Sequence, residues 1–409
     1  MTLKPGVEGS ALTWSQPNDV WTKETAMTTP QERLDPQLPL PRLRALVPES
    51  LKPPLRRLRK HVLILRYQWL VRLVDPRRDA QGIGRRLRQL SDAADKGIKW
   101  ALRELQSDAI TDPGDVLSAC YKGVWALSLA GRETQAKALL ERLTREMSSD
   151  GGLPAMPASP RHYIYRESFI AIGAHALGER EVFESMAGFV AAAQDPRTGG
   201  FWSLPPGSSE RWIDSASTAI GGLVLLRRGD LESATGAAEA LAKILGSQPT
   251  PREVFYTTMG GDGNLVTDPS LPRHRAIHVT LPDQPWFFLS LASLFLVELY
   301  KQTGDKKHLD LAIAHIEYLR SRKPWDRFFV PDSGKTAVAT AELYRLTGDK
   351  SYAHISLSTS AFIAGKQFPN GRWSYYLPGF GKIVIDTDLT FEYILWLTSV
   401  TGSFGMGEK

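Results

Sequence analysis

The sequence is poor in the features that mark secreted and membrane proteins. It has one cysteine, Cys120, which excludes an intrachain disulfide and, within an apolar helical pattern, predicts a small buried residue. No window reaches 18 uninterrupted apolar residues, so we expect no membrane span. The first 30 residues contain no apolar signal-peptide core. These absences together predict a soluble cytoplasmic protein.

Net charge is also absent from most of the chain. The formal charge of +6 arises within residues 1–80, which carry 14 Lys and Arg against 8 Asp and Glu, and the remainder is neutral. A neutral body gives no surface-wide attraction for nucleic acid, so we predict no nucleic-acid partner. A basic arm can attract anionic lipid or an acidic protein. We therefore predict an N-terminal extended arm over 1–80 and a separate domain over 81–409.

Residues 55–75 are the one helical pattern of the arm. The segment begins with Arg56, Arg57, Arg59 and Lys60 and continues with an apolar body. A basic amphipathic helix of this kind is typical of peripheral contact with a membrane surface. The alternative is a helix that packs on the rest of the protein and keeps its charges in water. The sequence leaves both interpretations open.

What the chain does contain is a repeat of a helix, a glycine stop and a second helix. The intervals between stops are 47, 51, 75, 44 and 54 residues, a range that indicates stacked copies of one helical hairpin. Glycine suits the end of a helix because it accepts the left-handed backbone conformation. The stops lie at Gly131, Gly178, Gly229, Gly304, Gly348 and Gly402.

The helices alternate between mixed and uniformly apolar patterns. Segment 137–147 carries several charges, whereas 215–226 and 290–300 are almost wholly apolar. Amphipathic helices face solvent on one side, and uniformly apolar ones are buried, so six outer helices alternate with six inner ones. The predicted pairs are 84–107 with 114–130, 133–148 with 163–177, 180–194 with 214–228, 231–246 with 284–303, 306–321 with 333–347, and 350–367 with 386–401.

Residues 84–402 resemble the α/α-toroid enzymes. LYKQTGDKKHLDLAIAHIEYL (299–319) is similar to hairpins of the six-hairpin glycosidases and sugar epimerases, and AAAQDPRTGGFW (191–202) is similar to turns of the terpene cyclase and prenyltransferase toroids. The resemblance implies an all-α fold, an (α/α)6 toroid of six hairpins with its site in a central cavity. The cyclase motif Asp-x-Asp-Asp is incomplete, because Asp386-Thr-Asp388 is followed by leucine.

Carboxylates recur where the inner helices begin. Glycoside chemistry needs two carboxyl groups with different pKa values, and a closed ring would gather these at one rim. We predict Asp386 and Asp388 as the catalytic pair, with Asp214 and Glu167 beside them. The alternative is that each aspartate only caps its helix, since its oxygen accepts the free N–H groups of the first turn. The other candidates are Asp115, Asp283 and Asp332.

The segment 161–167 is dense in groups that transfer protons or hold anions. His162, Tyr163 and Tyr165 can act as general acids or bases with a nearby carboxylate. Arg161 and Arg166 can grip a substrate carboxylate with two parallel hydrogen bonds. Epimerases and lyases need this combination. The alternative is a solvated loop whose tyrosines pack against the helices.

The longest connection, 248–283, and the aromatic residues of the other connections complete the predicted rim. A loop this long in a compact domain is typical of a lid or binding loop. His274 and His278 have the spacing of a metal pair, but no third ligand can be named, so we predict no metal and no cofactor. The predicted substrate-binding residues of these connections are Arg273, Arg275, His278, Trp202, Trp286, Trp325, Arg327, Trp373, Tyr375 and Tyr376.

Three functions remain open. The first is a carbohydrate-active enzyme that acts on an acidic, uronate-containing oligo- or polysaccharide as a glycoside hydrolase, epimerase or lyase, with a small molecule or glycan as its substrate. The second is a cyclase-like enzyme in which Asp388 protonates an isoprenoid or polyketide chain, favoured by the number of aromatic residues. The third is a non-catalytic scaffold that binds a membrane or partner through the basic arm.

Overall fold

The structure is a computed structural model, and its description covers residues 80–107, 110, 112–153, 163–208, 211–268, 270–272, 274–281, 284–320, 333–374 and 382–405. Two compact units divide the chain, Met1–Arg57 and Leu58–Lys409, and all described residues belong to the second. The predicted helix 55–75 lies outside the described residues, and the division at residue 80 stays a prediction. None of the described helices is long and apolar enough to cross a membrane.

The described residues form thirteen helices and two small antiparallel sheets, in which β1 pairs with β3 and β2 with β4. The outer helices are α3 (Ala80–Gln106), α6 (Glu133–Thr144), α8 (Arg180–Ala192), α10 (Leu231–Gly246), α12 (Lys306–Arg320) and α14 (Lys350–Ala364). The inner helices are α4 (Pro113–Cys120) continued by α5 (Gly123–Leu129), α7 (Tyr165–Ala176), α9 (Ser215–Arg228), α11 (Phe287–Thr303), α13 (Gly334–Thr347) and α15 (Lys382–Ser403). The strands are β1 (Ile213–Asp214), β2 (Val254–Tyr256), β3 (Thr258–Met259) and β4 (Ala276–His278).

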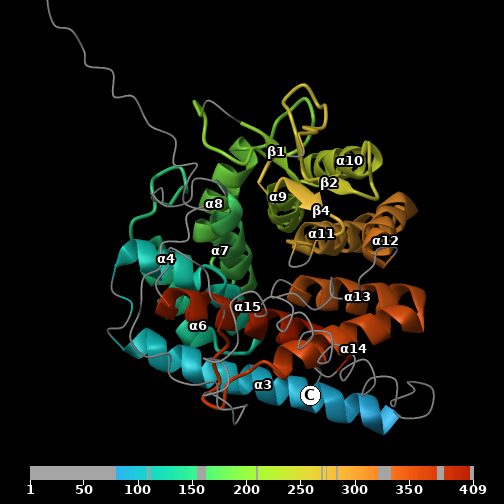
Figure 1. The fold of residues 1–409 in the computed structure, drawn as a ribbon. Helices are drawn as coiled ribbons and strands as arrows, with labels where there is room; N and C mark the ends of the chain where they lie inside the picture. The colour runs from blue at the N-terminus through green and yellow to red at the C-terminus, as the bar shows by residue number, and fades with distance from the viewer. Residues whose placement is uncertain are drawn as a thin grey trace, which may run out of the picture. The chain divides into compact units, whose positions relative to one another are not determined.

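The inner helices close into a ring. Helix α5 contacts α7, and the contacts continue through α9, α11 and α13 to α15, which contacts α5 again. The helical pairs follow one another around this ring in chain order (Figure 1). The structure thus confirms the predicted all-α toroid of six hairpins.

Burial separates the two layers as the patterns predicted. Every residue of α9 from Ser215 to Leu226 is buried, and α11 and α13 are buried over most of their lengths. Helix α10 buries one stripe of mainly alanine and leucine at helical spacing and exposes the opposite face. The exception is α14, an outer helix that is buried on almost all sides.

Several helix bounds differ from prediction by up to four residues, and two of the differences affect the candidate site. The expected helix 114–130 is divided at Tyr121 and Lys122 into α4 and α5. Gly123 lies at the break, where an added Cβ would approach Leu139 Cδ2 at 2.7 Å, so a larger residue would require that side chain to move. Helix α15 begins at Lys382, four residues before the predicted start, and this changes the position of the aspartates near its beginning.

Five predicted glycine stops lie in short turns at the inner-helix C-termini and have positive φ, namely Gly131, Gly178, Gly229, Gly304 and Gly348. The sixth prediction is wrong, because Gly402 lies within α15. Helix α15 continues to Ser403, and Gly405 is the residue with positive φ.

In two of the longer connections, a glutamine side chain links the connection to the next outer helix. The side chain of Gln194 donates to the carbonyls of Gly199, in its own turn, and Ser233 of α10. Gln367 likewise donates to the carbonyls of Gly371 and of Ala93 in α3. The second turn joins the last hairpin to the first described outer helix, so it closes the outer layer.

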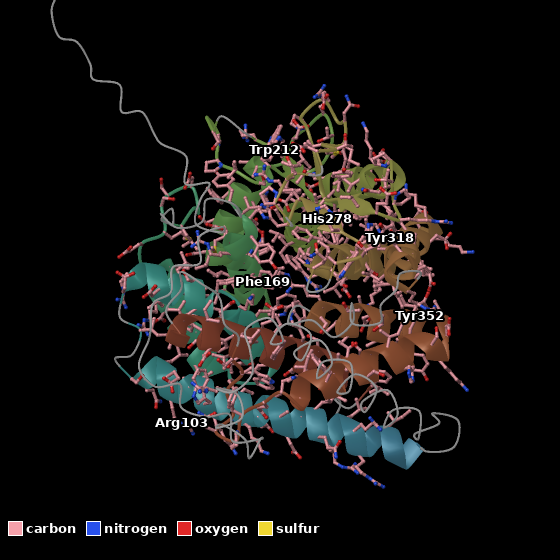
Figure 2. The ribbon with its side chains drawn as sticks, viewed as in Figure 1. Arg103, Phe169, Trp212, His278, Tyr318 and Tyr352 are labelled. Atoms are coloured by element: carbon pink, nitrogen blue, oxygen red, sulfur yellow. The ribbon has the colours of Figure 1, made fainter. Side chains whose placement is uncertain are left out.

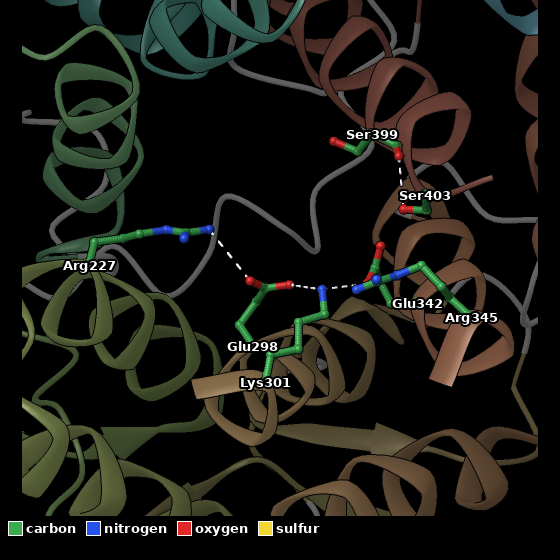
Figure 3. Close-up of polar contacts among 7 residues, drawn as sticks. All are labelled: Arg227, Glu298, Lys301, Glu342, Arg345, Ser399 and Ser403. Atoms are coloured by element: carbon green, nitrogen blue, oxygen red, sulfur yellow. Dashed lines mark hydrogen bonds and ion pairs between the residues drawn. The ribbon is translucent and has the colours of Figure 1, made fainter. Parts of the chain in front are cut away.

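Ionic contacts join the inner helices at the end of the ring where the glycine turns lie (Figure 3). Arg227 Nη2 lies 3.6 Å from Glu298 Oε2, and Lys301 Nζ lies 2.5 Å from Glu298 Oε1. Lys301 also pairs with Glu342, and Arg345 lies 2.9 Å from the same carboxylate. Cations at helix C-termini are favourable, so this network stabilises three neighbouring inner helices.

Candidate active site

Helix α15 presents different groups on its two faces. Asp388, Glu392 and Trp396 follow each other at a spacing of four residues, so they share one face. Trp396 packs edge-on against Trp125 of α5 with ring centroids 5.8 Å apart, which identifies this face as the one toward the ring interior. The opposite face carries Asp386, which faces the outer layer.

Four charged side chains meet on the interior face. Lys122 Nζ lies 2.7 Å from Asp388 Oδ1 and 2.5 Å from Glu392 Oε2. Lys335 at the start of α13 pairs with Glu392 Oε1, which also accepts a 2.9 Å hydrogen bond from Trp396 Nε1. Both lysines and Glu392 are almost fully buried, whereas the Asp388 side chain is 28 % exposed. Asp388 is therefore the member of this interior cluster that a ligand can reach.

Aromatic rings surround the interior cluster. Tyr121 packs against Tyr165 and Phe169 with centroid distances of 6.1 and 5.7 Å. The Phe169 ring centroid lies 5.9 Å from that of Trp125 in α5 and 6.3 Å from that of Trp396 in α15, so Phe169 contacts both of these helices. Phe169 lies well inside the ring of helices (Figure 2). Rings of this kind offer flat faces to sugars and negative π-faces to cations.

The environment drives the pKa values of the two interior carboxyl groups apart. Burial and the negative charge of Glu392 raise the pKa of Asp388 above its ordinary value, against the opposing charge of Lys122. Burial alone would also raise the pKa of Glu392. The positive charges of Lys122 and Lys335 outweigh this effect and lower the pKa of Glu392 to about 2. The carboxylates keep the pKa of Lys122 well above normal despite its burial. Two acids with separated pKa values suit acid/base chemistry.

The other predicted aspartates have structural contacts. Asp386 is fully buried, and its Oδ2 accepts a 2.8 Å hydrogen bond from Arg372, far from a cap position because α15 begins at Lys382. Asp214 caps α9, where its Oδ1 accepts from the backbone of Ala216 and Ser217 and its Oδ2 from the Ser217 hydroxyl. These contacts do not bring Asp214 or Asp386 to Asp388.

Asp115 differs from Asp214 and Asp386. It lies exposed in the first turn of α4, and the residue that caps this helix is Asp112. Asp112 Oδ1 accepts hydrogen bonds from the backbone N–H groups of Gly114 and Asp115. The capping alternative therefore holds for Asp214 but is wrong for Asp115, because Asp112 caps α4.

Helix α7 separates its predicted residues in the same way as α15. Tyr165 faces the ring interior, where it packs against Tyr121. Glu167 lies two residues farther, on the opposite face, where it is 2 % exposed and accepts a hydrogen bond from the backbone of Leu153. Burial raises the pKa of Glu167 to about 7, and the charge of Arg166 opposes the shift.

The rim beside α7 carries Tyr163, predicted as catalytic, together with Trp202 and Arg275, predicted to bind substrate. The backbone N–H of Tyr163 donates to Ser203, and the Arg211 guanidinium stacks 4.4 Å from the Trp202 ring. The Arg275 guanidinium lies 3.2 Å from the centroid of the Trp212 ring. Trp212, labelled in Figure 2, directly precedes β1 in the chain. The rim thus carries two arginine–tryptophan stacks.

Other predicted residues lie in the core or outside the described chain. Trp286 is 2 % exposed, and Trp373 is buried with its Nε1 donating to the Ile363 carbonyl, so neither presents a face to a ligand. His278 belongs to β4, and its backbone N–H donates to Gln284. The candidates outside the described residues are Arg161, His162, Arg273, Asp283, Trp325, Arg327, Asp332, Tyr375 and Tyr376.

Sequence reasoning missed Lys122, Lys335 and Glu392, although a signal was present. Each is a single charge within an otherwise apolar inner-helix pattern, as in ACYKGVWAL (119–127) and TFEYILWL (390–397). A buried charge is costly unless it is paired, so isolated charges on helices predicted to be buried indicate an internal cluster. Among the described residues, no three His, Cys, Asp or Glu side chains form a metal-binding group.

No protein-family model matches the chain, and no curated protein sequence matches it. Solved structures with the same fold include a D-mannose isomerase, with 13 % identity, a TM-score of 0.54, and coverage of 75 % of this chain and 96 % of that one. An unsaturated glucuronyl hydrolase specific for heparin has 11 % identity and a TM-score of 0.53, with coverage of 76 % and 96 %. A family 76 alpha-mannanase of Bacteroides thetaiotaomicron has 11 % identity and a TM-score of 0.52, with coverage of 76 % and 95 %. At these identities the similarity establishes the α/α-toroid fold.

Proposed function

We propose that this chain is an acid/base enzyme acting on a uronate-containing oligo- or polysaccharide, with Asp388 as the proton-transferring group. One observation carries the proposal: Asp388 is the accessible carboxyl of a buried four-charge cluster inside an aromatic ring interior. Structures with this fold include proteins described as an alpha-mannanase, an unsaturated glucuronyl hydrolase specific for heparin and a D-mannose isomerase. The aromatic faces suit the C–H faces of sugar rings.

The helix directions support an anionic substrate. Because each hairpin is antiparallel, all inner helices direct their N-termini toward the rim that carries the long connections. Helix N-termini bear partial positive charge and favour negative groups nearby. Arg166, Arg211 and Arg275 add positive charge to the same rim. A uronate would therefore be attracted to the mouth of the ring that leads to Asp388.

The contacts of Glu392 favour epimerisation or elimination over hydrolysis by paired acids. Glu392 Oε2 contacts Lys122, and Oε1 contacts Lys335 and Trp396, so this carboxylate is engaged at both oxygens. A retaining or inverting hydrolase needs two carboxyl groups that both reach the scissile bond. Asp388 with the charged Lys122 beside it instead suits proton removal next to a uronate carboxylate, where developing negative charge needs a cation.

The test is turnover by the full chain on a panel of oligoglucuronides, oligogalacturonides and heparin fragments, with neutral mannan as the comparison. Reducing ends report hydrolysis, ultraviolet absorbance of unsaturated uronates reports elimination, and deuterium uptake from D2O reports epimerisation. We expect conversion of an acidic substrate that Asp388→Asn abolishes and Asp115→Asn, on the exposed first turn of α4, leaves intact. Equal activity of Asp388→Asn and the wild type contradicts the role of Asp388.

The aromatic interior supports a second candidate, a cyclase-like enzyme for an isoprenoid or polyketide chain. Tyr121, Trp125, Tyr165, Phe169 and Trp396 form continuous ring contacts. Such faces stabilise carbocations, and a carboxyl group with a raised pKa is a better proton donor at neutral pH. Cyclised products from polyprenyl substrates, lost in Asp388→Asn, would favour this function over the first.

A further inference from the structure

Buried polar atoms without hydrogen-bond partners gather at the rim beside α7. They are Arg166 Nη1, Glu167 Oε2, Ser203 Oγ and Arg211 Nε. Glu167 and Ser203 are themselves 2 % and 6 % exposed. Leaving one buried donor or acceptor unpaired costs about 1–3 kcal/mol, and more when the group is charged. Two guanidinium nitrogens and a carboxylate oxygen in this state need ordered water or a ligand to complete their hydrogen bonds.

Tyr163 shows that these atoms belong to one place. Its backbone donates to the Ser203 carbonyl, and Ser203 in turn donates from its backbone to Trp212, the neighbour of Arg211. Burial and the charges of Asp150 and Glu167 raise the pKa of Tyr163, and the charge of Arg211 lowers it. The charges of Glu167 and Arg211 therefore both act on the Tyr163 side chain, and the backbone bonds connect Tyr163 to Ser203 and Trp212.

The chemistry of the four groups restricts the ligand. Guanidinium nitrogens only donate, so Arg166 and Arg211 need an oxygen acceptor, and an anionic oxygen makes the strongest such bond. Ionised Glu167 only accepts and needs a hydroxyl or amine donor. A molecule with a carboxylate and neighbouring hydroxyl groups satisfies both requirements.

We propose that Arg166, Glu167, Ser203 and Arg211 form a second binding site, at the rim, for a hydroxylated carboxylate of the sugar-acid class. This rim site is separate from the interior cluster because Glu167 and Tyr165 lie on opposite faces of α7, and Tyr165 is the residue that contacts the interior. The choice of sugar acids rests on the proposed function, but the existence of an anion site does not. A polysaccharide could bind here with one residue while another reaches Asp388.

Calorimetric titration of the full chain with D-glucuronate tests the rim site, with glucose 6-sulfate and neutral glucose as the comparison ligands. We expect saturable binding of glucuronate and none of glucose, because a neutral sugar offers no anion to the two arginines. Arg211→Met and Arg166→Met should each weaken binding at least about tenfold, the loss of one charge-assisted hydrogen bond. Binding of the sulfate ester as strongly as glucuronate would support the anion site and broaden its ligand class.

Matched variants separate this site from the interior. Asp388→Asn should keep full glucuronate binding even though it removes the proposed turnover, and Arg345→Met at the opposite end of the ring should change neither. Ser203→Ala, a smaller change, should weaken binding where an arginine variant fails to fold. The proposal is overturned if no anion binds saturably, which would assign the unpaired atoms to water, or if Asp388→Asn removes binding that Arg211→Met retains. The absence of turnover with binding intact would reject only the proposed function.

Discussion

Asp386 and Asp388 lie two residues apart on α15 and face opposite sides of the helix. Asp386 pairs with Arg372 of the preceding connection, and Asp388 pairs with Lys122 across the ring interior. The spacing of two residues turns the side chain by more than half a helical turn, so two neighbouring acids cannot share one substrate here. One of them stabilises the outer layer, and the other is the candidate proton-transfer group.

Lys122→Met should destabilise the fold and shift any acid/base activity. The variant leaves Asp388 and Glu392 without the cation between them, and removing one partner of a buried ion pair costs roughly 3–5 kcal/mol. The remaining charge of Glu392 should raise the pKa of Asp388 further, so its ionised form would appear only at higher pH. Denaturant unfolding and the pH profile of turnover measure both effects.

The double variant Lys122→Met with Asp388→Asn is the control for this prediction. It removes one cation and one anion together and leaves the pair of Lys335 and Glu392 in place. We expect it to be more stable than Lys122→Met alone. An equal or lower stability would show that Lys122 acts through packing of its alkyl chain instead of its charge.

The sequence predicted the fold well because the fold depends on periodic patterns. Uniformly apolar helices, mixed helices and glycine turns recur, and five of the six predicted stops have the expected backbone conformation. Gly402 failed because a glycine near the end of a helix does not by itself stop it. The break at Tyr121 and Lys122 was missed because the apolar pattern continues on both sides of it.

The site was harder to predict, because a local pattern does not say which face of a helix a residue occupies. We predicted all four catalytic candidates of α7 and α15 at one cavity. The helical phase places Asp388 and Tyr165 on the interior faces of their helices, and Asp386 and Glu167 on the opposite faces. Lys122 and Glu392 are far apart in sequence and meet only when the ring closes. The order of the hairpins along the chain does not say which residues of neighbouring helices face each other.

Gly371→Ala should weaken the closure of the outer layer. Gly371 has φ of +99°, a conformation that L-residues rarely adopt, and an added Cβ would collide with the carbonyl oxygen of Lys96 in α3. We expect a loss of roughly 2–4 kcal/mol in unfolding free energy, measured by thermal and denaturant unfolding. Gly131→Ala is the matched control, since it has φ of +68° but open space around it, and should cost about 1 kcal/mol. Similar losses for both would argue against the contact with α3.

Glu342→Gln should destabilise the ring at neutral pH and have little effect in acid. Burial alone would raise the pKa of Glu342. Hydrogen bonds from Lys301, Ser403 and Arg345 outweigh this effect, so the pKa of Glu342 is lowered. An acid with a lowered pKa contributes stability above its unfolded pKa, which is lost as the pH falls through the folded value. We expect the variant to lose about 1–3 kcal/mol at pH 7. Unfolding curves that stay separated at strongly acid pH would contradict this account.

Glu167→Gln should have the opposite pH dependence. Burial raises the pKa of Glu167 from 4.5 to about 7, so the folded state holds its proton more tightly than the unfolded state. The native protein then binds more protons between these two values, and stability falls as the pH rises through this range, by roughly 3 kcal/mol for a shift of this size. Glutamine cannot ionise, so the variant should lack this fall and be more stable than the wild type near pH 8 without ligand.

Unfolding free energies at pH 5, 6, 7 and 8 measure the difference, and parallel pH curves for the two proteins would show that Glu167 is ionised in the folded state throughout. A sugar acid at the rim site supplies the donor that ionised Glu167 needs, so saturating glucuronate should narrow the gap between wild type and variant near pH 8.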